Sequence, residues 1–260
     1  MLPIRIGLVD TTGSVDAGAM SAVAAALNTQ VTRDLPQFWT TIASVTYLPD
    51  PNAIPAGVWP VLLVKSLPPN EGGFHLTLNN QPYAQVLVTP GSDEWTVDAS
   101  HEMIEMLVDP CGNRLQPSTA VQITGNDVED GAGQYEYLLE ACDPCEADAC
   151  TYRIDGIRVS DFISPNFYDA AAAAGIRYSF TGAIQRPRQI LPGGYITWMD
   201  AQGMLQQILR LDANAPPQSR SLGKPTGASL RAFVENSTAQ HVHAKRSAIR
   251  SASIMAAKRG

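Results

Sequence analysis

The residues with the clearest capacity for chemistry lie in the segment 100–110, which reads SHEMIEMLVDP. His101 and Glu105 are four residues apart, so on a helix their side chains share one face, as two metal ligands from a single helix must. Glu102 follows the first of them and could act as a general base toward a metal-bound water. A site of this kind needs one or two further ligands, which other parts of the chain must supply.

Additional ligands are expected from acidic residues near this helix. The helix offers Asp109, and the downstream run LLEACDP (138–144) offers Glu140 and Asp143. All ionisable residues of 94–109 fall within one arc of roughly 100° on a helical wheel, and no Lys or Arg shares that face. Acidic side chains at this spacing repel, and a divalent cation would offset the repulsion. The plain alternative is an acidic helix face that contacts only water.

The elements expected around the motif alternate between strands and helices. Strands are predicted at 4–10, 41–48 and 59–67, a helix at 17–35, a hairpin at 74–89, and the motif helix at 94–109. The first half of the predicted hairpin, 74–79, is polar and suited to the edge of a sheet. Residues 116–137 are rich in Gly, Asp and Gln and are predicted as loop. A hairpin turning at Asp155-Gly156 is predicted at 151–163, short strands at 177–184 and 193–200, and a strand or helix at 203–212.

This order of elements, taken with the helix motif, resembles the N-terminal half of the zincin metallopeptidases. The two runs SHEMIEMLVDP and LLEACDP resemble a zincin-like group that includes the plant Exordium or phosphate-induced proteins and many uncharacterised bacterial proteins. The likeness covers about the central third of the chain. The matching positions are His101, Glu102, Glu105, Asp109, Pro110, Glu140 and Asp143.

The resemblance implies an α/β or α+β domain with a zincin-like mixed sheet and an edge strand beside the motif helix. It further implies that this edge strand holds a substrate, with His75 and Thr77 as the contacting residues. Glu105 departs from the usual His-Glu-x-x-His pattern, because a carboxylate replaces the second imidazole. That change makes the site harder, so zinc is expected first, with calcium or another divalent cation as the alternative.

Two further groups of residues could support the site. Tyr152 and Tyr168 are candidates for a phenol that stabilises an oxyanion, although ordinary packing is the simpler explanation for each of them. The segment EACDPCEADAC (140–150) is rich in cysteine. A structural zinc, one or two disulfides, and free thiols all remain open for the four cysteines, which are Cys111, Cys142, Cys145 and Cys150.

Charge divides the 260-residue chain into two parts. The net charge is −7, yet residues 213–260 hold eight of the 18 Lys and Arg residues and one of the 25 acidic residues. We therefore predict a zincin-like domain over 1–212 and a basic linker and tail over 213–260, partly helical near 227–258. The tail is expected to be solvated, to dock on the acidic body, or to engage a partner. Nucleic acid is an unsuitable partner for the acidic body but a possible one for the tail.

The sequence contains no secretory signal and no apolar run long enough to span a bilayer, so a cytoplasmic protein is the default expectation. The favoured function is metal-dependent hydrolysis of a peptide or protein substrate, with Glu102 as the base. The alternative is a non-catalytic structural or binding protein on the same scaffold, part of a larger assembly, whose acidic site a metal stabilises.

Overall fold

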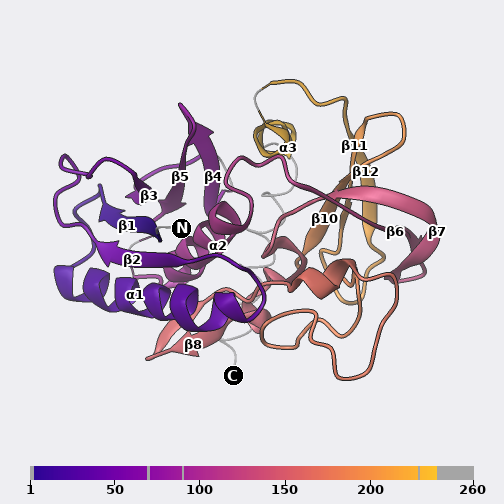
Figure 1. Ribbon diagram of the computed structural model, residues 1–260, viewed down its shortest axis with the longest axis horizontal. Coiled ribbons are helices and arrows are strands. Elements are labelled where there is room, and N and C mark those ends of the chain that lie inside the picture. The colour runs from indigo at the N-terminus through magenta and orange to yellow at the C-terminus, as the bar shows by residue number, and fades with distance from the viewer. Residues whose placement is uncertain (1–2, 69–70, 90, 228, 239–260) are drawn as a thin grey trace.

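The computed structural model describes residues 3–68, 71–89, 91–227 and 229–238. The chain is a mixed α/β protein with two five-stranded sheets and a two-stranded sheet, and Figure 1 shows the two larger sheets at opposite ends of the molecule. The first sheet has the order β2-β1-β3-β5-β4. Its strands are β1 (Ile4–Asp10), β2 (Ala43–Tyr47), β3 (Val58–Val64), β4 (Gly73–Leu78) and β5 (Gln81–Leu87).

Strand β4 forms one edge of this sheet, as the sequence predicts. It runs antiparallel to β5, whereas β2, β1, β3 and β5 pair in parallel. The hairpin turns at Asn79 and Asn80, whose φ angles of 50° and 62° match a two-residue turn that favours asparagine. This tight turn fixes the register of β4, which places His75 opposite Ala84.

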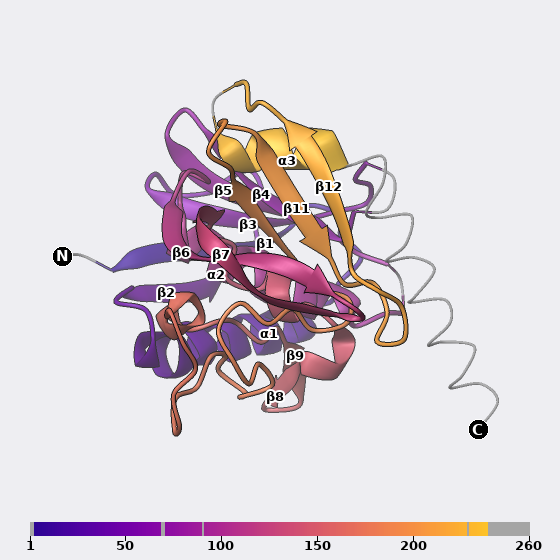
Figure 2. The ribbon, with the colours of Figure 1, turned by 90° about the vertical axis from the view of Figure 1, so that its right-hand side faces the viewer.

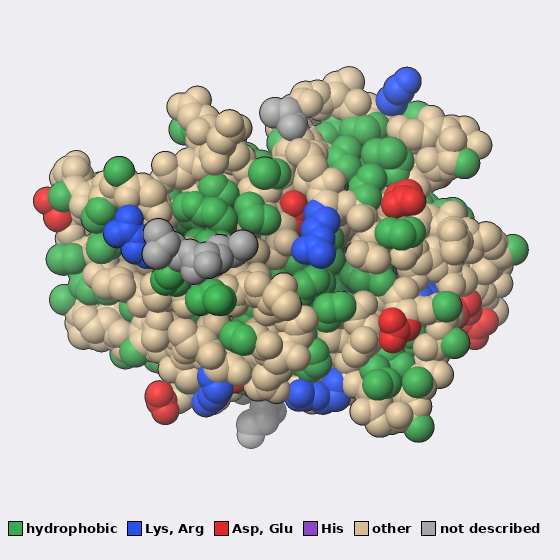
Figure 3. Space-filling model, viewed as in Figure 1, with side chains coloured by type: hydrophobic (Ala, Val, Ile, Leu, Met, Phe, Trp, Pro, Cys, Tyr) green, Lys and Arg blue, Asp and Glu red, His purple; other side chains and the backbone are tan. Residues whose placement is uncertain are grey.

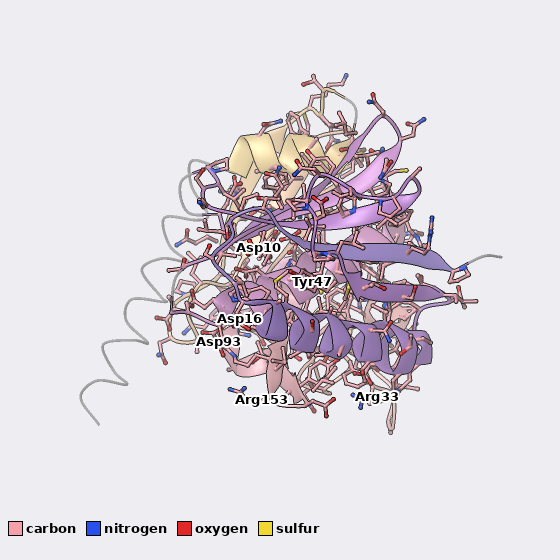
Figure 4. The ribbon with its side chains drawn as sticks, turned by 90° about the vertical axis from the view of Figure 1, so that its left-hand side faces the viewer. Asp10, Asp16, Arg33, Tyr47, Asp93 and Arg153 are labelled. Atoms are coloured by element: carbon pink, nitrogen blue, oxygen red, sulfur yellow. The ribbon has the colours of Figure 1, made fainter. Side chains whose placement is uncertain are left out.

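Two helices pack on the first sheet. Helix α1 (Ala17–Thr29) begins at Asp16, whose side chain accepts from the Ala19 amide, and it continues through a π turn (Gln30–Asp34) and a 3-10 turn (Leu35–Gln37). Figure 4 shows α1 crossing the sheet, with Asp16 at one end and Arg33 at the other. Helix α2 (Glu94–Val108) contacts β5, β4 and β3 and carries the His-Glu motif.

The second sheet corrects the prediction that residues 116–137 form a loop. This region is a long hairpin of β6 (Leu115–Thr124) and β7 (Asp127–Leu138). Its composition resembles a loop because much of the ribbon is exposed, and backbone pairing holds it together. The full order is β12-β11-β10-β7-β6, with β10 (Tyr195–Met199), β11 (Leu205–Leu209) and β12 (Gln218–Gly223), and all of its pairings are antiparallel.

Some of the smaller predicted elements are confirmed, and one is wrong. The hairpin of β8 (Tyr152–Ile154) and β9 (Ile157–Val159) turns at Asp155-Gly156 as predicted, with φ angles of 49° and 84°. The strand expected at 177–184 is wrong, since the β pairing of that described segment is one isolated bridge between Ile163 and Ser179. The segment 203–212 forms strand β11 rather than a helix.

Part of the expected linker and tail joins the second sheet. Strand β12 pairs with β11, and helix α3 (Leu230–Thr238) packs on this sheet through the buried Val234, which clusters with Leu138 and Leu205. Figure 2 shows α3 lying along β11 and β12. The polar composition of β12 suits an edge strand, which is why it reads as linker. Residues 239–260 of the expected tail lie outside the described residues.

Helix α2 lies between the two sheets and is buried along nearly its whole length (Figure 1). The sequence assigned its acidic arc to solvent or to a cation, and the structure encloses that arc against the second half of the chain. His101 is 7% exposed and Glu105 is fully buried. None of the helices in the described residues combines the length and apolar character that crossing a membrane requires.

Candidate functional site

The motif helix brings His101 and Glu105 together with Asp143, which follows β7 in the chain. His101 Nε2 lies 3.3 Å from Glu105 Oε2 and 3.3 Å from Asp143 Oδ1. The four-residue spacing on α2 accounts for the first contact. The second contact arises because a 3-10 turn (Asp143–Cys145) packs beside α2, where the Cys142 amide donates to Glu105 Oε1 at 3.0 Å. The sequence-predicted convergence of these three side chains is therefore present.

Histidine 75 joins the same cluster from the edge strand. Its Nδ1 lies 3.2 Å from Glu102 Oε2, within hydrogen-bond geometry, and 3.7 Å from Glu105 Oε2. His75 is 1% exposed, so it is an interior residue and does not offer its side chain to a substrate. The sequence assigned His75 to substrate binding because a lone histidine on a strand gives no indication of what it faces.

Two groups of three ligand atoms could hold a metal ion among the described residues, and Glu105 belongs to both. One group is His101, Glu105 and Asp143; the other is His75, Glu102 and Glu105. In the second group, the hydrogen bond to His75 already occupies Glu102 Oε2. In the first group, Glu105 Oε2 and Asp143 Oδ1 are buried and have no hydrogen-bond partner, which favours the first group as the ion's place.

The spacing of the first group fits a small divalent ion. Ligands about 2.0–2.1 Å from a tetrahedral zinc ion lie about 3.3–3.4 Å from each other. The two measured separations from His101 Nε2 are both 3.3 Å. Leaving buried carboxylate oxygens without donors costs free energy, and a cation between them would remove that cost. The donor set, one imidazole and two carboxylates, is suited to zinc and to other first-row metals.

The charges of the cluster shift the pKa values of its members. Burial by itself would lower the pKa of His101, but Glu105 and Asp143 raise it well above its ordinary value. Burial would raise the pKa of Glu102, but the hydrogen bond with His75 and the charges of His101 and Arg231 lower it. The pKa of Glu105 is lowered in the same way, chiefly by His101. Glu102 is therefore a carboxylate at neutral pH.

Arg231 of α3 completes the cluster, a role that the sequence analysis does not predict. Its side chain is 3% exposed, and Nη1 lies 3.4 Å from Glu140 Oε2 and 3.7 Å from Asp143 Oδ2. Nη2 lies 2.8 Å from Glu235 Oε1, one helical turn further along α3. Within the described residues, Arg231 thus joins α3 to acidic groups of the preceding part of the chain. Its position as the second residue after a Gly-Ala-Ser run has no feature that separates it from other arginines.

Glu140 and Asp109 are near the cluster but have other contacts. Burial raises the pKa of Glu140 well above its ordinary value, and the charge of Arg231 opposes this rise. Glu140 pairs with Arg231 and belongs to neither group of metal ligands. The Asp109 carboxylate accepts from the Arg114 amide at 2.7 Å and so fixes the turn after α2. The structure thus reduces the four sequence-predicted carboxylate ligands to Glu105 and Asp143.

Of the remaining predicted residues, Thr77 and Tyr152 make contacts within the fold, and Tyr168 lies near the acidic groups. Thr77 donates to the Pro110 carbonyl, which ties β4 to the end of α2. Tyr152 is away from the cluster, where its hydroxyl donates to Asp34 Oδ2 at 2.9 Å. Burial and the charges of Glu140 and Asp143 raise the pKa of Tyr168 well above its ordinary value, so this tyrosine is a neutral phenol near the acidic groups.

The cysteines form neither a disulfide nor a metal-ligand group in the described residues. All four are free, with Cys111 exposed and Cys142, Cys145 and Cys150 buried. The Cys142 sulfur contacts the His101 carbonyl at 3.8 Å, and burial raises the pKa of its thiol well above the ordinary value. Of the three expected alternatives, the structure has free thiols, and the three buried cysteines pack the segment beside α2.

The sequence matches no family model, no curated protein and no solved structure. The interpretation of the cluster therefore depends on its own geometry.

Proposed function

We propose that this chain is a metal-dependent hydrolase that cleaves a peptide bond. The observation that carries the proposal is the convergence of His101 Nε2, Glu105 Oε2 and Asp143 Oδ1 at separations of 3.3 Å from the imidazole, with neither carboxylate oxygen in a hydrogen bond. Three protein ligands leave a coordination position for water or substrate, which is the pattern of catalytic rather than structural zinc sites.

Each residue has a separate task in this proposal. A zinc ion held by His101, Glu105 and Asp143 would supply Lewis acidity and a water of lowered pKa. Glu102 accepts the proton from the attacking water, and its lowered pKa keeps it in the carboxylate form that this step needs. His75 holds Glu102 in place through its contact with Oε2. Tyr168 and Tyr195 are buried neutral phenols near these charges and are candidates for donating to a developing oxyanion.

We infer in addition that the fold is zincin-like. Support comes from the edge strand β4, which lies beside the motif helix and contacts it through His75 and Thr77. Because those two side chains face inward, an extended substrate would pair with the backbone of β4 and not with its side chains. Zinc is the proposed ion, and manganese or another first-row metal is a close second because two of the three ligands are carboxylates.

The test is to compare metal content and peptide cleavage in matched variants. Glu102→Gln should keep the metal and lose cleavage of a peptide library by about a thousandfold, whereas His101→Ala should lose both. Glu94→Gln, at the first turn of the same helix, is the control and should change neither. Retained cleavage in Glu102→Gln would remove the general base from the account.

A second candidate is a non-catalytic protein whose acidic interior is stabilised by an ion. The observation that favours it is burial, since His101, Glu105 and Asp143 are all less than a tenth exposed and α3 lies above them. The same experiment separates the two functions. If the metal-loaded wild type cleaves no peptide while metal raises its melting temperature, the binding or assembly function is the correct one.

A further inference from the structure

Helix α3 covers the cluster from the side of the second sheet. It contacts β12 of the second sheet and β4 of the first, so it bridges the two halves above α2 (Figures 1 and 2). Its apolar side chains form a small cluster with the second sheet that is separate from the main core; the members from α3 are Leu230, Phe233 and Val234. On the face seen in Figure 3, neither of the described histidines reaches the surface.

The polar face of α3 is directed at the carboxylates. Arg231 reaches Glu140 and Asp143, and within the helix it pairs with Glu235. The backbone docks as well, since the Arg231 amide donates to the Gly112 carbonyl at 2.9 Å and the Leu230 amide donates to Asn113 Oδ1 at 2.9 Å. The backbone contacts and the buried guanidinium both belong to the N-terminal end of α3, so the helix docks through that end.

Gly112 and Arg231 are in close contact where α3 docks. A Cβ atom added at Gly112 would lie 2.5 Å from the Arg231 Cβ, so no side chain is accommodated there while α3 is docked. Gly112 has a φ of +61°, as the turn after α2 requires. This contact provides a way to disturb the docking of α3 without changing any charge.

Arg231 adds a positive charge next to Glu140 and Asp143, at the side of the cluster that faces α3. Asp143 is shared, because its Oδ1 faces His101 and its Oδ2 faces the guanidinium of Arg231. A divalent ion seated beside Asp143 Oδ1 would be close to this guanidinium, in an interior where like charges repel strongly. The ion and the guanidinium would both neutralise Asp143, so the presence of one reduces the attraction for the other.

We propose that α3 is a lid whose Arg231 neutralises the carboxylates in place of a metal ion, so that docking of α3 and metal binding oppose each other. This inference rests on the metal site of the proposed function and describes its regulation. Binding of the ion loosens α3 and opens the side of the cluster next to β4, where a substrate strand would enter. Coupling of two binding events is reciprocal, so each side can be measured separately.

The first measurement is the affinity for Zn²⁺ alone, by calorimetry on the full chain freed of metal. Arg231→Met keeps much of the side-chain volume and removes the charge, and it should bind zinc at least about tenfold more tightly than the wild type. Arg231→Lys should remain close to the wild type. The control is Arg153→Met, because Arg153 is an exposed arginine of the β8–β9 hairpin (Figure 4).

The second measurement is hydrogen exchange in residues 229–238 with and without zinc. Zinc should speed exchange there by the same factor by which the docked lid weakens zinc binding. Gly112→Ala should mimic this effect without metal and should also tighten zinc binding. Gly125→Ala is its control, because Gly125 has a φ of +59° and nothing within 4 Å of an added Cβ.

The outcomes separate the lid from the metal site. If the wild type binds zinc at this cluster but neither Arg231→Met nor Gly112→Ala binds it more tightly, the lid is overturned and the metal site stands. If zinc slows exchange in 229–238, the two events are cooperative and the lid is again overturned. If no variant binds zinc, the metal site itself is wrong and the lid is wrong with it.

Discussion

The two halves of the molecule contribute to the cluster in different ways. The first half provides His75, His101, Glu102 and Glu105 from one hairpin and one helix, within about thirty residues of the chain. The second half provides Asp143 from a short turn and Arg231 from a terminal helix, almost ninety residues apart. Regular elements hold the ligands and the base, whereas the counter-charge depends on tertiary docking.

This difference separates what is fixed from what can move. Helix α2 is buried among main-core residues on the first sheet, so the His101 and Glu105 side chains are positioned before any ion binds. Helix α3 rests on a small satellite cluster of apolar side chains around Leu138, Leu205 and Val234. Its contact with the carboxylates, through Arg231, is electrostatic. Elements with few buried apolar contacts open at low free energy. We therefore expect the first half to bind the ion and the second half to regulate access to it.

The largest effect is expected at Glu105, which belongs to both ligand groups. Glu105→Gln removes one negative charge next to both histidines and should weaken zinc binding by about a thousandfold, measured by competition with a chelator. Glu94→Gln should bind as the wild type does. Zinc binding that survives in Glu105→Gln would mean that the ion is held elsewhere.

A smaller effect is expected in the second half, where two neighbouring carboxylates have different roles. Asp143→Asn should weaken zinc binding by about a hundredfold, because Asp143 lies at ligand distance from His101 Nε2. Glu140→Gln should not weaken zinc binding, because Glu140 faces Arg231. Loss of the Glu140 charge loosens the docking of α3. A large loss in Glu140→Gln would restore Glu140 as a metal ligand.

The affinity for zinc should rise with pH. Burial by itself lowers the pKa of His101, but Glu105 and Asp143 raise it well above its ordinary value, so the metal-free site holds a proton that zinc must displace. Below the raised pKa, affinity should increase about tenfold per pH unit for each proton released, and it should level off above that pKa. Calorimetry in buffers of different ionisation enthalpy counts the protons. An affinity independent of pH over about pH 6 to 9 would contradict the protonated cluster.

The smallest effect concerns the local stability of α3 compared with the stability of the first sheet. Val234→Ala removes buried methyl groups from the satellite cluster and should lower the local stability of α3 by about 1–2 kcal/mol, seen as faster exchange in 229–238 with little change in melting temperature. Val61→Ala, in the fully buried centre of the first sheet, should instead lower the melting temperature. Equal effects of both variants on global melting would mean that α3 is part of the main cooperative unit.

The same contrast explains how much the sequence could predict. In the first half, hydrophobic runs and the Asn79-Asn80 turn predict the strands and the edge hairpin, and the spacing of His101 and Glu105 predicts their shared face. In the second half, β6 and β7 are exposed, polar and glycine-containing, so their composition predicts a loop. Strands of this kind are specified by pairing between distant backbones, which local composition does not encode.

The site shows the same limit. Asp143 could be predicted as one of several acidic candidates, but the choice between Asp143, Glu140 and Asp109 depends on which carboxylate meets His101 and which meets Arg231 or Arg114. His75 could not be assigned, because its position opposite α2 depends on the register of β4. Arg231 could not be assigned either, since nothing in a basic segment identifies the one arginine that is buried.

The most direct test is a crystal structure of the full chain after exchange into zinc. We predict one ion bound by His101 Nε2 and by carboxylate oxygens of Glu105 and Asp143, at distances of about 2.0–2.2 Å. The guanidinium of Arg231 should be displaced from Asp143. An ion bound by the cysteines, or no ion at this cluster while the Arg231 contacts persist, would contradict this prediction.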